Sequence, residues 1–189
     1  MKHILPAFRI FLFLSIVTGL VYPILMTALG HGLFRNQVDG QMIKKAGVLI
    51  GAKPIGQKFT AEKYFWGRPS SVDYNPIPSG GSNLGPTSEV LKKAVNDRAA
   101  IIRKNMGLSE TDAIPQDLLF ASGSGLDPDI SPEAAEFQSV RIARVRGIDV
   151  AQVQKIIEAH VVPPDLGFLG DPRVNVLELN LALDEGLHE

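Results

Sequence analysis

The chain opens with one long apolar stretch and continues as a sequence in which apolar and polar positions alternate over short distances. No charged side chain occurs among the 20 residues from Ile10 to Leu29. At the helical rise, a stretch of this length covers the hydrocarbon core of a bilayer, which is about 30 Å thick. The pattern predicts a short N-terminal segment over residues 1–9, a transmembrane helix over 10–30 and one soluble domain over 31–189.

A cleaved signal peptide is the alternative interpretation of this stretch. Lys2 and Arg9 precede it, and Ala28-Leu29-Gly30 loosely resembles a cleavage site. The apolar part of a signal peptide usually has about 7–15 residues, so the length favours a retained anchor. The charges on the two flanks do not fix the orientation, because a long domain can cross a membrane regardless of its charge.

One side of the predicted span is lined by small or helix-disturbing residues. Ser15, Gly19, Pro23 and Thr27 recur at every fourth position and therefore lie along one side. Small residues at this spacing allow another helix to approach closely in lipid, although such residues are also simply tolerated there. This stripe is the predicted interface with a partner helix. Pro23 is expected to bend the helix or to end its regular part.

Capping signals predict three helices in the soluble part. The first follows Thr87-Ser88-Glu89 and runs to about Asn105, and the second begins at Ser131-Pro132 and stops near Gly147. The third begins at Asp149, with Gln152 completing a capping box, and ends before two prolines.

Strand signals are weaker. Short apolar runs make residues 48–50 and 118–120 strand candidates, and residues 174–183 show both strand-like alternation and helix-start signals, with helix slightly favoured. The expected fold is a single transmembrane helix followed by one helix-rich α/β (α+β) domain with short strands.

Composition excludes several classes of function. The 19 basic and 20 acidic residues nearly balance, and no basic run suggests a nucleic-acid partner. Because cysteine is absent, disulfides, thiolate catalysis and cysteine metal sites are excluded. The soluble part is long enough for one domain with a core of its own.

Two segments resemble known phosphate-binding or catalytic motifs without matching them. Residues 51–58 resemble a phosphate-binding loop, but Gln57 replaces its lysine, and residues 122–125 lack the glycine spacing of a nucleophile elbow. Asp127 and Asp129 fit a turn before a helix cap more simply than a cation site. No pair of histidines has ligand spacing: His3, His31, His160 and His188. No catalytic residue, metal site or cofactor of its own is predicted.

Three loops remain as candidates for contacts: residues 64–70, 79–88 and 121–131. Exposed amides in glycine-rich loops can bind anions or a partner's carbonyls, although tight turns within one domain explain the same composition. The weak candidates for loop contacts are Gly80, Gly81, Ser82, Asn83, Ser122, Gly123, Ser124 and Gly125. Tyr64, Trp66 and Arg68 have the composition of an interface anchor, although such aromatic clusters more often form core.

Five motifs in collinear order carry a family resemblance: GLVYP at 19–23, YFWGRPS at 64–70, SGGSNL at 79–84, SGLDPDIS at 124–131 and VNVLELNLALD at 174–184. In this order, and behind an N-terminal anchor, they resemble the C subunits (KdpC) of the Kdp-type potassium-transporting ATPases. The resemblance covers nearly the whole chain. Residues 86–111 and the tail after Asp184 carry no recognisable motif of the family.

The resemblance implies a place in an inner-membrane complex for potassium import. Its partners would be the potassium-conducting A subunit, the ATP-hydrolysing P-type B subunit and the small F subunit, together with membrane lipid. The family's C subunit is credited with assembly of the complex and, in one proposal, with raising the ATP affinity of the ATPase subunit as a catalytic chaperone. Any ATP would thus act through the complex.

The resemblance also places the N-terminus in the cytoplasm and the domain in the periplasm, away from ATP. An external cap beside the potassium entry is therefore the expected physical role, and any effect on ATP affinity would be indirect coupling. Two other classes of function remain as alternatives. One is a membrane-anchored periplasmic enzyme, for which no catalytic constellation can be assembled, and the other is a cleaved periplasmic binding protein.

Overall fold

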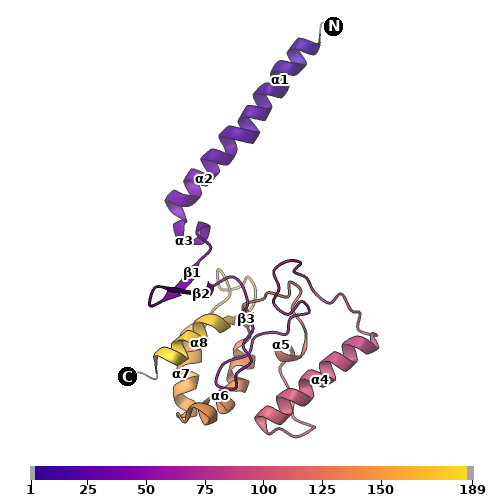
Figure 1. The fold of residues 1–189 in the computed structure, drawn as a ribbon, viewed down its shortest axis with the longest axis vertical. Coiled ribbons are helices and arrows are strands. Elements are labelled where there is room, and N and C mark those ends of the chain that lie inside the picture. The colour runs from indigo at the N-terminus through magenta and orange to yellow at the C-terminus, as the bar shows by residue number, and fades with distance from the viewer. Residues whose placement is uncertain (1–2, 187–189) are drawn as a thin grey trace. The chain divides into compact units, whose positions relative to one another are not determined.

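The computed structural model describes residues 3–186. The chain divides into two compact units, Met1–Ala52 and Lys53–Glu189. Figure 1 shows an apolar helix and a small hairpin in the first unit and a helix-rich domain in the second. This architecture confirms the predicted fold class, an N-terminal apolar helix followed by a helical domain with short strands.

The apolar helix is longer than the uncharged stretch that predicts it. It runs continuously over Ile4–Leu33 and comprises 30 residues, none of which is buried within the chain, and an 18-residue window of it has a mean hydropathy of 2.2. Its parts are α1 (Ile4–Ile16), a π-helical turn η1 (Val17–Val21) and α2 (Tyr22–Leu33). A helix that is apolar on all sides and covered by nothing fits a single-pass membrane protein.

The π turn explains how the helix passes Pro23. Proline has no N–H to donate to the carbonyl of Gly19, and its ring would collide with that carbonyl in a regular α-helix. The chain accommodates the ring by widening the preceding turn, in which the Tyr22 N–H donates to the carbonyl of Val17. The predicted disturbance therefore lies just before Pro23, and the helix does not end there.

The rest of the first unit is a short helix and a hairpin. α3 (Arg35–Val38) precedes β1 (Met42–Lys45) and β2 (Val48–Ala52), which pair antiparallel with an irregularity between Ile43 and Lys44. Ala46 and Gly47, which connect the strands, both have positive φ, as a tight hairpin turn requires. The strand predicted at 48–50 is confirmed.

The helices of the second unit begin and end where the caps predict. α4 (Glu89–Met106), α6 (Pro132–Arg146) and α7 (Val150–His160) follow the caps Ser88, Ser131 and Asp149, and Asp149 forms the predicted capping box. Gly107 and Gly147 end α4 and α6 in the left-handed conformation. The remaining helices are α5 (Gln116–Leu119) and α8 (Val176–Glu185).

A three-stranded sheet holds the middle of the second unit. β3 (Asp129–Ile130) and β4 (Val161–Val162) pair antiparallel with the two edges of β5 (Arg173–Asn175), in the order β3-β5-β4. The ambiguous segment 174–183 therefore uses both conformations, because Asn175 closes the strand and caps α8 with its side chain. The strand predicted at 118–120 is wrong. Leu118 and Leu119 end α5, and so short an apolar run cannot distinguish strand from buried helix.

The core forms where α6, α7, α8 and β5 meet. Its members have exposed fractions of a few per cent or less: Phe65, Ile102, Leu118, Ile130, Ala134, Ala135, Ile142, Ala143, Val153, Ile157, Val174, Val176, Leu179 and Leu183. Phe65 is fully buried although it lies in a segment without regular secondary structure. Asn180 of α8 compensates, since its Oδ1 accepts from the Phe65 N–H at 2.7 Å and its Nδ2 donates to the Phe65 carbonyl at 3.0 Å.

Asn180→Ala is expected to destabilise the domain strongly. Asn180 is 2% exposed, so its loss would leave an N–H and a carbonyl of Phe65 buried without partners, at a cost of about 3 kcal/mol. Thermal unfolding of the purified chain, followed by circular dichroism, measures the effect. Asn96→Ala, at an exposed position of α4, is the matched control and should leave the melting temperature nearly unchanged. Equal melting of the two variants would contradict the role given to Asn180.

Candidate functional site

The structure brings together the three loops that the sequence singles out. Ser71 Oγ donates to the carbonyl of Gly80 at 2.7 Å, joining the first loop region to the second. The Ser122 N–H donates to the carbonyl of Pro69 at 3.0 Å, joining the first loop to the third. We call this meeting point of residues 68–72, 80–81 and 122–127 the loop junction.

Glycine is required at the loop junction because backbone segments approach one another closely. A Cβ on Gly81 would lie 3.0 Å from the carbonyl oxygen of Gly123, whereas a Cβ on Gly80 would meet no atom within 4 Å. Gly125 has φ +70° and lies against Val72 and the Gly80 carbonyl. Clearance, not a special backbone angle, is therefore the constraint at Gly81.

The other candidate residues of these loops divide between surface and interior. Ser82, Asn83, Gly123 and Ser124 are exposed, while Ser122 and Gly125 are buried. Ser124 Oγ accepts from the Leu126 N–H at 3.0 Å, which is a local turn contact. The exposed members are free to meet a partner, and their role in contacts stays a prediction.

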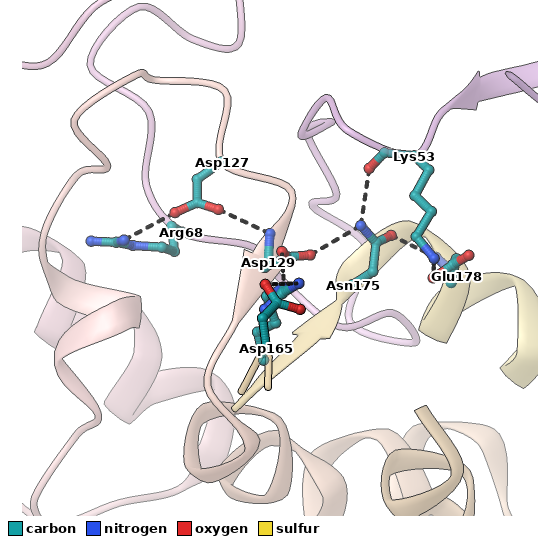
Figure 2. Close-up of polar contacts among 8 residues, drawn as sticks. Lys53, Arg68, Asp127, Asp129, Asp165, Asn175 and Glu178 are labelled. Atoms are coloured by element: carbon teal, nitrogen blue, oxygen red, sulfur yellow. Dashed lines mark hydrogen bonds and ion pairs between the residues drawn. The ribbon is translucent and has the colours of Figure 1, made fainter. Parts of the chain in front are cut away.

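A polar network links the loop junction to the sheet, as Figure 2 shows. Arg68 Nη1 lies 3.0 Å from Asp127 Oδ2, and Asp127 Oδ1 accepts from the Asp129 N–H at 3.1 Å. The second contact is the turn predicted for this motif, and Ser131 then caps α6. Asp127 and Asp129 thus organise the chain before a helix.

Asn175 is the centre of the other half of this network (Figure 2). Its Nδ2 donates to the carbonyl of Lys53 and to Asp129 Oδ1, each at 3.0 Å, and its Oδ1 accepts from the Glu178 N–H at 3.1 Å. Lys53 Nζ also lies 2.8 Å from Glu178 Oε2. One asparagine therefore ties the first residue of the second unit to β3 and to α8.

The carboxylate of Asp129 is partly buried and lies among charged groups of both signs. Burial and the nearby carboxylate of Asp127 raise the pKa of Asp129, against the hydrogen bond from Asn175 and the positive charges of Arg173 and Lys53. Arg173 Nε lies 3.5 Å from Asp129 Oδ2. Burial therefore outweighs the neighbours that favour the charged form of Asp129.

Tyr64 is joined to the C-terminal helix. Its hydroxyl donates to Asp184 Oδ2 at 2.8 Å, and Arg146 Nη2 lies 2.8 Å from Asp184 Oδ1. The hydrogen bond to Asp184, together with burial, raises the pKa of the Tyr64 hydroxyl. Burial alone would raise the pKa of Asp184, but the hydrogen bonds from Arg146 and Tyr64 outweigh it and lower that pKa.

Trp66 is held through both its backbone and its ring. Its N–H donates to Gln138 Oε1 at 2.8 Å, and its carbonyl accepts from Gln138 Nε2 at 3.1 Å. The guanidinium of Arg141 lies 4.0 Å from the centre of the indole. Burial lowers the pKa of Arg141 to about 10, so the guanidinium keeps its charge at neutral pH.

Tyr64, Trp66 and Arg68 are therefore all half-buried and engaged inside the domain. Their role in docking a partner stays a prediction. Gln138 and Arg141 hold Trp66, and Arg146 fixes the Asp184 partner of Tyr64; none of these three was singled out by the sequence. The only signal that could have found them is that polar side chains occupy core-facing positions of amphipathic helices.

A groove of about 330 Å³ runs beside this segment. Most of its lining is apolar: Phe59, Trp66, Pro69, Ile101, Ile102 and Leu118. Arg98 and Glu62 are the charged residues of the lining, and Arg98 Nη1 donates to the carbonyl of Leu119 at 2.7 Å. Burial lowers the pKa of Arg98. The lining suits an apolar group better than a polyanion.

On the apolar helix, Ser15, Gly19, Pro23 and Thr27 are all exposed, and Gly19 lies inside the π turn. A Cβ on Gly19 would meet no atom of the chain within 4 Å. The space beside this glycine is therefore open to a neighbour, and the helix interface stays a prediction. Within residues 3–186, no group of three or more histidine, aspartate or glutamate side chains could hold a metal ion. His188 lies outside that range.

Comparison with known proteins identifies relatives along the whole chain. The family described as "KdpC: K+-transporting ATPase, c chain" matches residues 4–185. A "Potassium-transporting ATPase KdpC subunit" of Methylococcus capsulatus is 45% identical over 186 residues, which cover 97% of each chain.

Other relatives carry the same description. The protein of Variovorax paradoxus is 47% identical over 182 residues, covering 95% of this chain and 94% of its own. That of Mycobacterium tuberculosis is 45% identical over 185 residues, covering 97% of this chain and 98% of its own. With near-complete coverage at this level of identity, the chain belongs to the family of KdpC subunits of potassium-transporting ATPases.

Proposed function

We propose that this chain is a non-catalytic accessory subunit of an ATP-driven, high-affinity potassium import complex, needed for its assembly and stability. The observation that carries the proposal is family membership over nearly the full chain. The side chains at the sequence motifs support it, because they are engaged in holding the domain together. Tyr64, Trp66 and Arg68 each contact a residue of the domain's own interior or loops.

The proposed partners are the other components of the complex: a potassium-conducting protein, an ATP-hydrolysing protein and a small third one. The apolar helix would anchor the chain in the bacterial inner membrane, with its N-terminus in the cytoplasm and the domain in the periplasm. The exposed small residues beside the π turn would meet a helix of a partner, since close approach in lipid needs such residues.

In this orientation the domain acts as an external cap beside the potassium entry, and an effect on ATP affinity is transmitted through the complex. The groove beside Trp66 supports this choice over direct nucleotide binding. A nucleoside triphosphate carries several negative charges, whereas the groove offers Arg98 with one N–H already donated to the carbonyl of Leu119. The catalytic-chaperone role in its direct form is the second candidate.

Purification from membranes in mild detergent tests the proposal. An affinity tag on this chain is expected to recover a potassium-conducting and an ATP-hydrolysing protein in fixed ratio, identified by mass spectrometry. Recovery of this chain alone, under conditions where an unrelated membrane complex stays intact, would contradict the accessory role.

Gly81→Val should reduce potassium-stimulated ATP hydrolysis by the complex several-fold. The new side chain would press on the carbonyl of Gly123 and shift the exposed residues of both loops, which are the ones offered to a partner. Gly85→Val is the matched control, because Gly85 is exposed, is not among the candidate contact residues, and its Cβ would meet no atom within 4 Å.

The melting temperature of each variant separates docking from folding. If Gly81→Val melts like the parent and the complex keeps full activity and potassium affinity, this loop has no docking role. If the parent chain binds ATP directly and Gly81→Val abolishes the binding, the catalytic-chaperone role replaces the external cap.

Gly19→Leu should weaken co-purification of the potassium-conducting protein while leaving the chain inserted in the membrane. The larger side chain adds hydrophobicity, which favours insertion, and fills the space that a neighbouring helix would need. Gly32→Leu, near the end of the same helix and off the stripe, is the matched control and should have little effect. Unchanged yield and transport with Gly19→Leu would show that the stripe faces lipid.

A further inference from the structure

A small apolar tip protrudes from the second unit, in the connection between β4 and β5. Leu166 is 82% exposed, Phe168 is 75% exposed and Leu169 is 50% exposed, and Gly167 separates the first two. We call residues 166–169 the apolar tip; it lies in the segment between α7 and α8 in Figure 1. Single exposed apolar residues are common, but three within four positions form a patch that calls for a partner.

The apolar tip is held in a fixed shape by its own backbone. The Leu169 N–H donates to the carbonyl of Asp165 at 2.9 Å, and the Asp165 N–H donates to the carbonyl of Leu169 at 3.0 Å. The Gly167 N–H donates to the carbonyl of Pro164 at 3.0 Å. A closed turn of this kind presents its side chains without further ordering on binding, which favours recognition.

Strain accompanies this shape. Leu166 has φ +54°, a left-handed conformation that costs a leucine about 1 kcal/mol or more. Its exposed side chain contributes almost no packing energy to the fold, because it contacts little of the domain. Strained residues that make no stabilising contact within the fold are typical of functional sites.

The apolar tip is connected to the place where the anchored segment enters the domain. Arg173, at the start of β5, lies 3.8 Å from Asp165 Oδ2 and 3.5 Å from Asp129 Oδ2. Asp129 is bonded through Asn175 to Lys53, the first residue of the second unit. Two residues of the same strand, Arg173 and Asn175 of β5, therefore hold the base of the tip and the point where the chain enters the domain. Lys53 lies 20 residues after Leu33, the last residue of the apolar helix.

Charge decides between the surfaces that an apolar tip could meet. Asp165, whose side chain is 72% exposed, and Asp171 flank it, and the first basic residue that follows, Arg173, is shared between Asp165 and Asp129. Anionic lipid headgroups attract basic flanks and repel acidic ones. A pocket in a protein, apolar at its centre and basic at its rim, fits both the tip and its flanks.

We propose that the apolar tip is a docking anchor that inserts Leu166 and Phe168 into an apolar, basic-rimmed pocket on the extramembrane surface of the potassium-conducting protein. This inference rests on the proposed function, because it assumes the complex. Asp165 and Asp171 face the basic rim and set the orientation. The buried aromatic ring supplies most of the binding energy, as aromatic anchors do at other interfaces.

Substitution at Phe168 within the complex tests the anchor. Phe168→Asp should reduce the yield of the co-purified potassium-conducting protein about tenfold or more. Phe168→Leu keeps an apolar anchor and should stay within about twofold of the parent. Val90→Asp is the matched control for a new carboxylate at an apolar position, because Val90 is 66% exposed at the start of α4 and tolerates a negative charge there.

A second measurement identifies what the apolar tip touches. The photo-reactive residue p-benzoyl-phenylalanine in place of Phe168 should cross-link this chain to the potassium-conducting protein in the intact complex. The same residue in place of Val140, which is 62% exposed on α6, should give no such adduct.

The outcomes separate the anchor from the proposed function. If the parent chain recovers no partner, the accessory role fails and the anchor fails with it. If the parent forms the complex but Phe168→Asp co-purifies equally well, or the cross-link at 168 reaches lipid only, the anchor is wrong while the accessory role stands. Melting of Phe168→Asp at the parent's temperature excludes unfolding as the cause of a loss.

Discussion

The domain depends on the way in which side chains satisfy the backbone of residues 62–66, a segment that belongs to no helix or strand. Five consecutive carbonyls accept hydrogen bonds from side chains of α6 and α8: those of Glu62 and Tyr64 from Arg141, that of Lys63 from Arg146, that of Phe65 from Asn180 and that of Trp66 from Gln138. An unpaired backbone group in the interior costs as much as a lost hydrogen bond. Side chains of these helices therefore supply the hydrogen bonds that a neighbouring strand supplies in a sheet.

This arrangement explains why the motifs of the chain lie together. Once Phe65 and Trp66 are fixed, Arg68 and Pro69 follow at a set position, where they hold the loops around Ser122 and Asp127. From Asp127, the contacts continue through Asp129 and Asn175 to the chain entry. Residues that are widely separated in the sequence thus form one connected support for the exposed loops.

Features that depend on contacts between neighbours in the sequence were predicted, whereas features that depend on contacts between distant residues were not. Helix starts at Ser88, Ser131 and Asp149 were predicted correctly because a cap is decided within four residues. The segment 118–120 was assigned to the wrong conformation because its helix is defined by packing. Asn180, the hydrogen-bond partner of the Phe65 backbone, lies 115 residues away in the sequence, and no local pattern encodes such a pairing. The candidate loops were recognised by composition, but their junction and the exposure of the apolar tip arise only when distant segments fold together.

The π turn in the apolar helix has a consequence for its rotational phase. In a regular α-helix each step from one residue to the next turns the chain by about 100°, so the eight steps from Ser15 to Pro23 overshoot two full turns by about 80°. A π turn takes in one extra residue, which removes about 100° of rotation over this interval. Ser15 and Pro23 are thereby brought back to within about 20° of the same direction. The proline that interrupts the hydrogen bonding thus straightens the line of small residues along the helix, and a neighbouring helix could follow that line without winding around it.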